Sequence, residues 1–192
     1  NRRSQYFGAI DSSGGRSDSF TMSCAFENEG RAAIACLRER IPPFNPKEVI
    51  AEFSEVFKSY NIKSIMADNY AAEFVTQGFK DNGIQVINTK DSKSKLYLDL
   101  LPILNSGTIE LLDSHRLSHQ LKSLDRRTRS GRDLIDNFSG SGHEDCANVV
   151  ALVVSALAKP KHIPRVRSIT EVEETDDEYE KMKHDGKWID LF

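Results

Sequence analysis

Two aspartates hold matching places in the sequence, each directly after a short apolar run and before a polar loop. Asp11 follows the run Tyr6 to Ile10, and Asp68 follows the run Ile62 to Ala67. If the two runs are neighbouring strands of an open α/β sheet, both carboxylates emerge at its carboxyl edge, where such sheets place their sites. For one aspartate alone, a turn or helix cap is the ordinary alternative.

A third acidic group, His143-Glu144-Asp145, stands where the last long apolar helix is expected to begin. Three carboxylates with few basic neighbours suit hard cations such as Mg²⁺ or Mn²⁺. Two such ions about 4 Å apart can clamp an in-line attack on a phosphodiester, one activating water and the other stabilising the leaving oxygen. The three acids together therefore indicate metal-dependent phosphodiester chemistry more strongly than any one of them.

The elements that must position these acids alternate in type. Ser19 to Phe26 and Arg31 to Arg38 are typical of strands joined by a tight turn, which predicts an antiparallel meander with the first run. The following β-α-β-α-β alternation predicts parallel pairing, because parallel strands need crossover connections. The later predicted elements are a helix over Ser92 to Asn105, a strand over Thr108 to Leu112, a helix over Ser114 to Leu124, a hairpin over Arg126 to Asp136 and a helix over Glu144 to Ala158.

The chain has 192 residues, of which 39% are hydrophobic, enough for one real core. We expect one globular domain over residues 1–158 and an acidic C-terminal tail or docking segment over 159–192. The longest apolar stretch, Val149 to Ala158, is too short to cross a bilayer. Three cysteines without a CxxC pair favour a reducing, intracellular setting. The missing initiator Met suggests a piece of a longer protein.

The net charge of −3 hides a basic middle and an acidic tail. Basic side chains in the middle could contact DNA phosphates, although a solvated basic face is the plainer alternative. The candidate DNA-binding residues are Lys93, Lys95, Lys122, Arg126, Arg127, Arg129 and Arg132.

Several segments, in order along the chain, resemble the nuclease domain of tailed-phage terminase large subunits. They are Gly8 to Phe20 with its Asp-Ser-Ser-Gly-Gly turn, Ala67 to Glu73, Ser94 to Gly107, and Leu124 to Arg129 followed by Gly142 to Asn148. The resemblance implies an RNase H-like α/β fold. In that fold, helices flank a central mixed sheet of five or more strands. The sheet begins with an antiparallel meander and continues with parallel strands.

The resemblance also implies a site. It assigns Asp11, Asp68 and Asp145 as catalytic residues and as ligands of two divalent cations, Mg²⁺ or Mn²⁺. The family often has His-Asp-Asp where this chain has His143-Glu144-Asp145, so Glu144 is a further candidate ligand and the main third ligand stays open. His143 could orient Glu144, position water or cap the helix.

The implied function is a two-metal-ion DNA endonuclease that cuts double-stranded DNA with little sequence preference during viral genome packaging in the host cytoplasm. The implied partners are double-stranded DNA, the packaging ATPase domain of the same polypeptide, the portal and the small terminase subunit, with no membrane. The chain has no GxxxxGK[ST] phosphate loop, so this sequence itself is not the packaging motor.

Three alternatives stay open. Another RNase H-like nuclease, of junction-resolvase or transposase type, would prefer branched DNA. A non-catalytic DNA-binding domain of the same fold would be expected to lack one of the acids, and all three are present. The third alternative is a structural zinc site at His115 and His119, which have the spacing of two ligands on one helical turn. The sequence has no HExxH motif and no nearby cysteine pair to complete such a site.

Overall fold

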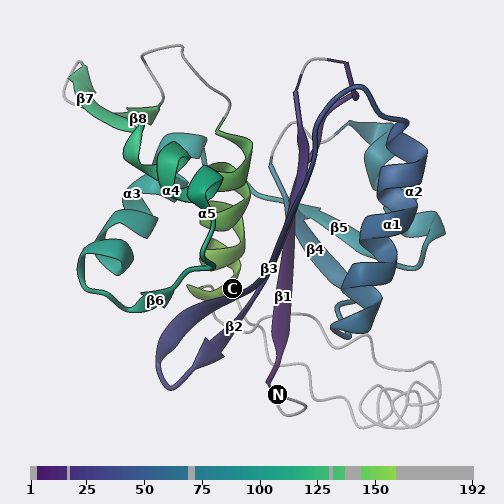
Figure 1. Cartoon of the computed structure of the whole chain (residues 1–192), viewed down its shortest axis with the longest axis horizontal. Helices are drawn as coiled ribbons and strands as arrows, with labels where there is room; N and C mark the ends of the chain where they lie inside the picture. Colours follow the sequence, from purple (N-terminus) through teal and green to yellow (C-terminus); the bar gives the residue numbers. More distant parts are fainter. Residues whose placement is uncertain (1–3, 17, 69–71, 130–131, 137–143, 159–192) are drawn as a thin grey trace, which may run out of the picture. The chain divides into compact units, whose positions relative to one another are not determined.

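A six-stranded mixed sheet forms the centre of the structure, a computed structural model that describes residues 4–16, 18–68, 72–129, 132–136 and 144–158. Its strands are β1 (Tyr6–Asp11), β2 (Phe20–Asn28), β3 (Arg31–Arg40), β4 (Ser64–Ala67), β5 (Gln85–Asn88) and β6 (Ile109–Glu110). Their order in the sheet is β5-β4-β1-β2-β3-β6 (Figure 1). The first three strands form the predicted antiparallel meander, while β4 and β5 add in parallel to β1.

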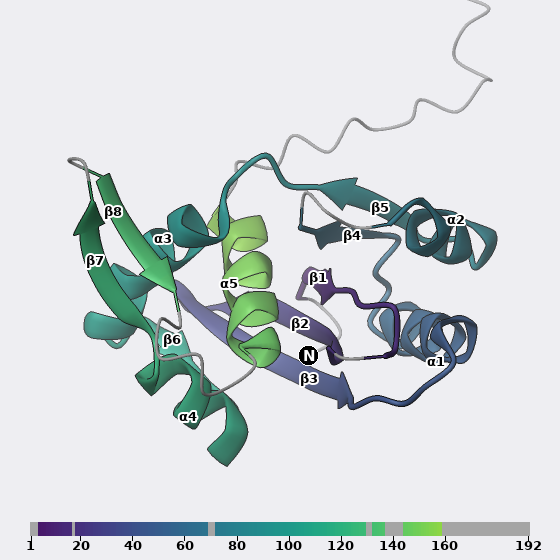
Figure 2. The ribbon, with the colours of Figure 1, turned by 90° about the horizontal axis from the view of Figure 1, so that it is seen from above.

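Helices cover both faces of the sheet, as predicted (Figures 1 and 2). On one face lie α1 (Pro46–Ser59) and α2 (Glu73–Asp81), and on the other lie α3 (Lys93–Asn105), α4 (His115–Lys122) and α5 (Asp145–Ala158). Each face has its own hydrophobic core, one built around Phe53, Phe57 and Phe79 and the other around α5. From Cys146 to Ser155 every residue of α5 is buried, since this helix packs between the sheet and its neighbouring helices.

The central strand β1 sends alternate side chains to the two cores. Ile10 belongs to the core beneath α1, and Ala9 belongs to the core beneath α5. Gly8 faces α1 so closely that an added Cβ would lie 2.7 Å from the ring of Phe57, and only glycine leaves room for that ring. Because alternation has a period of two, Asp11 must project on the side of Ala9, toward α5.

A separate two-stranded sheet, formed by β7 (Asp125–Arg129) and β8 (Arg132–Asp136), is the hairpin predicted from the sequence. It stands apart from the main sheet beside α3 (Figure 2). The beginning of α3 holds it, because Ser94 Oγ accepts a hydrogen bond from Ile135 N at 3.2 Å and donates one to Ile135 O at 3.1 Å. The hairpin is therefore fixed to the main body near the end of β8.

Two expectations about single residues need correction or qualification. The helical spacing of Phe53, Phe57, Phe74 and Phe79 in the sequence predicts four core residues. That prediction is wrong for Phe74, whose side chain is 49% exposed because Val75 and Phe79 take the buried face of α2. Cys24 and Cys146 are buried, as expected of small hydrophobes, whereas Cys36 is partly exposed.

In the described ranges, no helix has the length and apolarity needed to cross a bilayer. The acidic tail predicted over 159–192, Trp188 included, lies outside the described residues.

Candidate active site

Asp11 is the last residue of β1, Asp68 directly follows the neighbouring parallel strand β4, and both line one cleft. Ile10 in β1 is the register partner of Ala67 in β4, so the residues that follow them lie side by side at the carboxyl edge. Met66 packs against the core beneath α5, and Ala67 against the core beneath α1. By alternation Asp68 is expected on the α5 face, the face toward which Asp11 projects, and both carboxylates line the same cleft.

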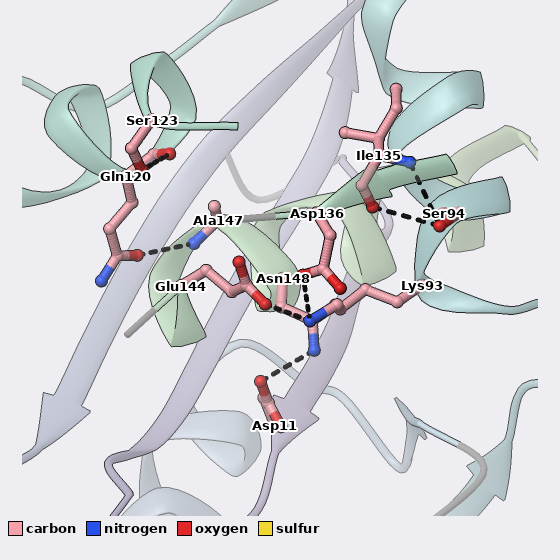
Figure 3. A network of polar contacts seen from close by, with 10 residues as sticks. All are labelled: Asp11, Lys93, Ser94, Gln120, Ser123, Ile135, Asp136, Glu144, Ala147 and Asn148. Atoms are coloured by element: carbon pink, nitrogen blue, oxygen red, sulfur yellow. Dashed lines mark hydrogen bonds and ion pairs between the residues drawn. The ribbon is translucent and has the colours of Figure 1, made fainter. Parts of the chain in front are cut away.

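The start of α5 is held against this edge by two contacts. Thr21, the register partner of Asp11 in β2, donates its hydroxyl to the backbone carbonyl of Asp145 at 3.0 Å. Gln120 of α4 accepts a hydrogen bond from the backbone N–H of Ala147 at 3.0 Å (Figure 3). That contact satisfies one of the N–H groups that a helix leaves open in its first turn. Asp145 is thereby fixed beside Asp11, and it lines the same cleft.

Asn148 is a site residue that the sequence reasoning missed. Its Nδ2 donates a hydrogen bond to Oδ2 of Asp11 at 2.8 Å, from a side chain that is almost fully buried (Figure 3). The spacing of Asn148 from Asp145, three residues along a helix, puts both on one face and was the available signal. The sequence alone could not show which neighbour that face would meet.

Burial raises the pKa of Asp11 to about 7. The hydrogen bond from Asn148 acts in the opposite direction, and the negative charges of Asp145 and Asp68 raise the pKa further. The three acids predicted from the sequence are therefore close enough to influence one another electrostatically. A buried carboxyl with a raised pKa at the edge of a sheet is typical of a functional site, since a structural role rarely needs one.

Lys93 brings a positive charge into the acidic cleft from the first turn of α3. Its Nζ lies 3.0 Å from Oδ1 of Asp136 and contacts the carboxylate of Glu144 (Figure 3). Burial alone would lower the pKa of Lys93, but the hydrogen bonds to Glu144 and Asp136 outweigh burial and raise it. The sequence has no Lys or Arg within a few residues of Asp68 or Asp145, and the fold supplies a lysine from a distant segment.

The cleft has a volume of about 590 Å³, and its lining combines acidic, basic and polar groups. Its lining residues are Asp11, Asp68, Lys90, Asp91, Ser92, Lys93, Ser94, Leu96, Asp136, Glu144, Asp145 and Asn148. A second hollow, of about 490 Å³, shares Asp11 and Asp145 with the first and has the exposed Phe74 in its wall. Asp11 and Asp145 thus form part of the walls of both hollows.

The donor set fits a hard divalent cation in an open site. Within the part of the chain that the structure describes, no three His, Cys, Asp or Glu side chains are close enough together to enclose a metal ion. Mg²⁺ does not need such a cage, because it keeps several waters and binds through one or two carboxylates plus phosphate oxygens. The oxygen of Asn148 next to Asp11 is buried, and it has no hydrogen-bond partner among the described residues. Asp11, Asp68, Asp145 and Glu144 are the candidate ligands, and one or two of these carboxylates would hold an ion together with water and phosphate oxygens.

Among the basic candidates Lys93 lines this cleft, and the others lie elsewhere on α3, α4 and the β7–β8 hairpin. Lys93 and Lys95 belong to α3, Lys122 ends α4, and Arg126 and Arg127 are exposed on β7. Arg126 pairs with Asp133 across the hairpin, and Lys95 pairs with Asp99 along its own helix. Arg129 and Arg132 are register partners of β7 and β8. His143 lies outside the described residues, so its role stays a prediction.

Comparison with solved structures relates this arrangement to a known fold. The large terminase nuclease from thermophilic phage G20c superposes with a TM-score of 0.68 at 21% identity, covering 81% of this chain and 83% of that one. The large terminase nuclease domain of Thermus phage P74-26 superposes with a TM-score of 0.68 at 20% identity, covering 83% of each chain. The chain has the fold of phage large terminase nucleases. The RNase H-like fold predicted from the sequence is thereby confirmed.

A longer terminase and metal-bound terminase nucleases are also among the similar structures. The large terminase of bacteriophage HK97 matches with a TM-score of 0.66 at 12% identity over 80% of this chain, which spans only 39% of that protein. The G20c terminase nuclease has been solved with bound magnesium, cobalt and zinc. No protein-family model and no curated protein matches the sequence.

Proposed function

We propose that this chain is a divalent-metal-dependent endonuclease that cuts double-stranded DNA with little sequence preference during viral genome packaging. The observation that carries the proposal is the convergence of Asp11, Asp68 and Asp145 on one cleft of a terminase nuclease fold. The G20c nuclease has been solved with bound magnesium and with bound cobalt, which supports the use of divalent ions, and we propose two at this cleft, Mg²⁺ or Mn²⁺.

The chain's own residues have defined tasks in this proposal. Asp11, Asp68 and Asp145 hold the ions, with Glu144 as a further candidate ligand. Asn148 keeps the carboxylate of Asp11 in place through its hydrogen bond. The bound ions supply the Lewis acidity that activates water and stabilises the leaving oxygen. Asp11 and Asp145 line two neighbouring hollows, and the duplex crosses the site there in this proposal.

We propose that the basic residues of α3, α4 and the β7–β8 hairpin hold the duplex through its phosphates. Contacts to phosphates carry no sequence information, which suits a nuclease with little sequence preference. Since HK97 large terminase is more than twice as long as the matched region, a packaging ATPase domain on the same polypeptide is part of the proposal. The portal and the small terminase subunit are further proposed partners, and the host cytoplasm is the proposed setting.

Cleavage of linear and supercoiled plasmid in Mn²⁺, with and without a chelator, tests this function. Wild-type protein should cut both substrates in Mn²⁺ and neither in EDTA. Asn in place of Asp11, Asp68 or Asp145 should abolish cleavage with an unchanged circular dichroism spectrum. Strong preference for branched DNA would indicate a resolvase-type enzyme instead. Metal-dependent DNA binding without cleavage by the wild type would indicate a non-catalytic domain.

A further inference from the structure

Lys93 is held by the same acidic groups that face the proposed metal site. Its ammonium contacts Glu144, which is 15% exposed at the start of α5, and Asp136, which is 44% exposed at the end of β8. Its charge also lowers the pKa of Asp11. In this arrangement the ammonium neutralises part of the cleft, and its own charge is not available to a phosphate.

Lys95 provides a contrast two residues further along the same helix. Its ammonium pairs with Asp99 one turn away, both side chains are about half exposed, and Lys95 does not line the main cleft. An exposed pair of this kind contributes little and is easily given up to another anion. Lys93 and Lys95 are therefore the same type of residue on the same helix, but they have different electrostatic surroundings.

We propose that Lys93 is an exchangeable counter-ion that couples metal binding to DNA binding. A divalent cation entering beside Glu144 competes with the ammonium for the same carboxylates, and its double charge favours the ion. The long, flexible lysine side chain then turns its charge toward a DNA phosphate at the mouth of the cleft. This inference rests on the proposed function, because it needs both a metal ion and DNA at this site.

The coupling has a definite physical sign. Without metal, the cleft presents several carboxylates to a polyanion, and Lys93 is committed to two of them. With metal, the carboxylates are neutralised and one more cation faces the duplex. DNA and metal should thus strengthen each other's binding, because coupling between two ligands is reciprocal. Lys93 opposes metal binding while DNA is absent and supports DNA binding once metal is present.

The test compares Lys93→Met with the matched variant Lys95→Met. Mn²⁺ affinity is measured by calorimetry without DNA. Duplex affinity is measured by fluorescence anisotropy, in EDTA and in Mn²⁺, within a time too short for appreciable cutting. Lys93→Met should bind Mn²⁺ at least about threefold more tightly, since a repelling charge is gone. Its ratio of DNA affinity in Mn²⁺ to that in EDTA should fall about tenfold, the scale of one charge-assisted contact.

The controls separate this coupling from simpler roles. Lys95→Met should lower DNA affinity equally with and without Mn²⁺, and Lys93→Arg should retain the coupling. Asp136→Asn, a change at a half-exposed side chain, should raise DNA affinity in EDTA and narrow the difference that Mn²⁺ makes. Weaker Mn²⁺ binding by Lys93→Met, or the same loss of DNA affinity in both conditions, overturns the inference. Neither result touches the proposed nuclease, which fails only if the wild type does not cut DNA in Mn²⁺.

Discussion

Asn148 of α5 donates a hydrogen bond to Asp11 of β1 across 137 positions of the sequence, at 2.8 Å. The bond joins the central strand of the sheet to the helix that carries Asp145. It also gives a buried carboxylate a donor, without which ionisation of Asp11 would be costlier. The geometry of the proposed metal site therefore depends on this amide as well as on the acids.

Replacing Asn148 with Ala should destabilise the metal-free protein by about 1–3 kcal/mol above pH 7, where Asp11 is ionised and would lose its donor. The variant should also gain less stability from Mn²⁺ than wild type, because Asp11 is no longer held in place. Asn82→Ala is the matched control, since Asn82 donates a 2.8 Å hydrogen bond to Gly78 O in α2, which does not line the cleft. Thermal melts in EDTA and in Mn²⁺ measure both effects. An equal Mn²⁺ gain in both variants would contradict a role for Asn148 at the site.

Asp145→Asn should raise the melting temperature of the metal-free protein and remove most of the stabilisation by Mn²⁺. In wild type, Asp145 repels the charge on Asp11, whereas bound metal stabilises the fold by mass action, about 2.7 kcal/mol at a hundredfold excess over Kd. Asp99→Asn loses only an exposed pair with Lys95 and should keep the full Mn²⁺ gain. If Asp145→Asn melts lower in EDTA and still gains fully from Mn²⁺, Asp145 is a structural helix-start residue.

The raised pKa of Asp11 predicts that the metal-free protein loses stability as pH rises toward 7. Between the ordinary value of 3.8 and about 7, the folded protein keeps a proton that the unfolded chain has released. Stability therefore falls with rising pH in this window, by up to about 1.4 kcal/mol per unit, and levels off above it. Denaturant titrations of wild type and Asp11→Asn, compared at each pH, isolate this contribution. Parallel curves for the two proteins would refute it.

Metal binding should show the opposite dependence on pH. Because the ion requires an ionised carboxylate, Mn²⁺ affinity should increase as pH rises and level off above about 7.

Arg127→Ala should weaken duplex binding about equally on unrelated sequences and flatten its salt dependence. Loss of one phosphate contact lowers the slope of log affinity against log salt by about 0.9. Lys58→Ala is a suitable control, because Lys58 forms an exposed ion pair with Glu55 near the end of α1, far from the site. That end of α1 lies at the start of β1, where Tyr60 packs against Tyr6, whereas Asp11 is at the other end of the strand. Filter binding across a salt series measures both slopes. Identical slopes would place Arg127 on a face that DNA does not contact.

The sequence predicted what depends on local pattern. Apolar runs that stop at polar loop residues predicted strand ends at Asp11 and Asp68 and a helix start at Asp145. The structure has all three side chains in the lining of one cleft. The position of Lys93 could not be predicted, because it depends on how α3 docks beside β8 and α5. Phe74 was misassigned because helical spacing fits two faces of a short helix, and only packing decides between them.

The contacts around α5 also determine when the site can exist. A ribosome makes the chain from its N-terminus, and α5 is the last of the described elements to be synthesised. Until α5 emerges, the sheet lacks Asp145 and Asn148, and Asp11 and Asp68 line only part of a site. The proposed nuclease is therefore incapable of cutting throughout most of its own synthesis. A nascent chain released before α5 would be inert and would expose the apolar sheet face that α5 covers, which makes it a target for quality control.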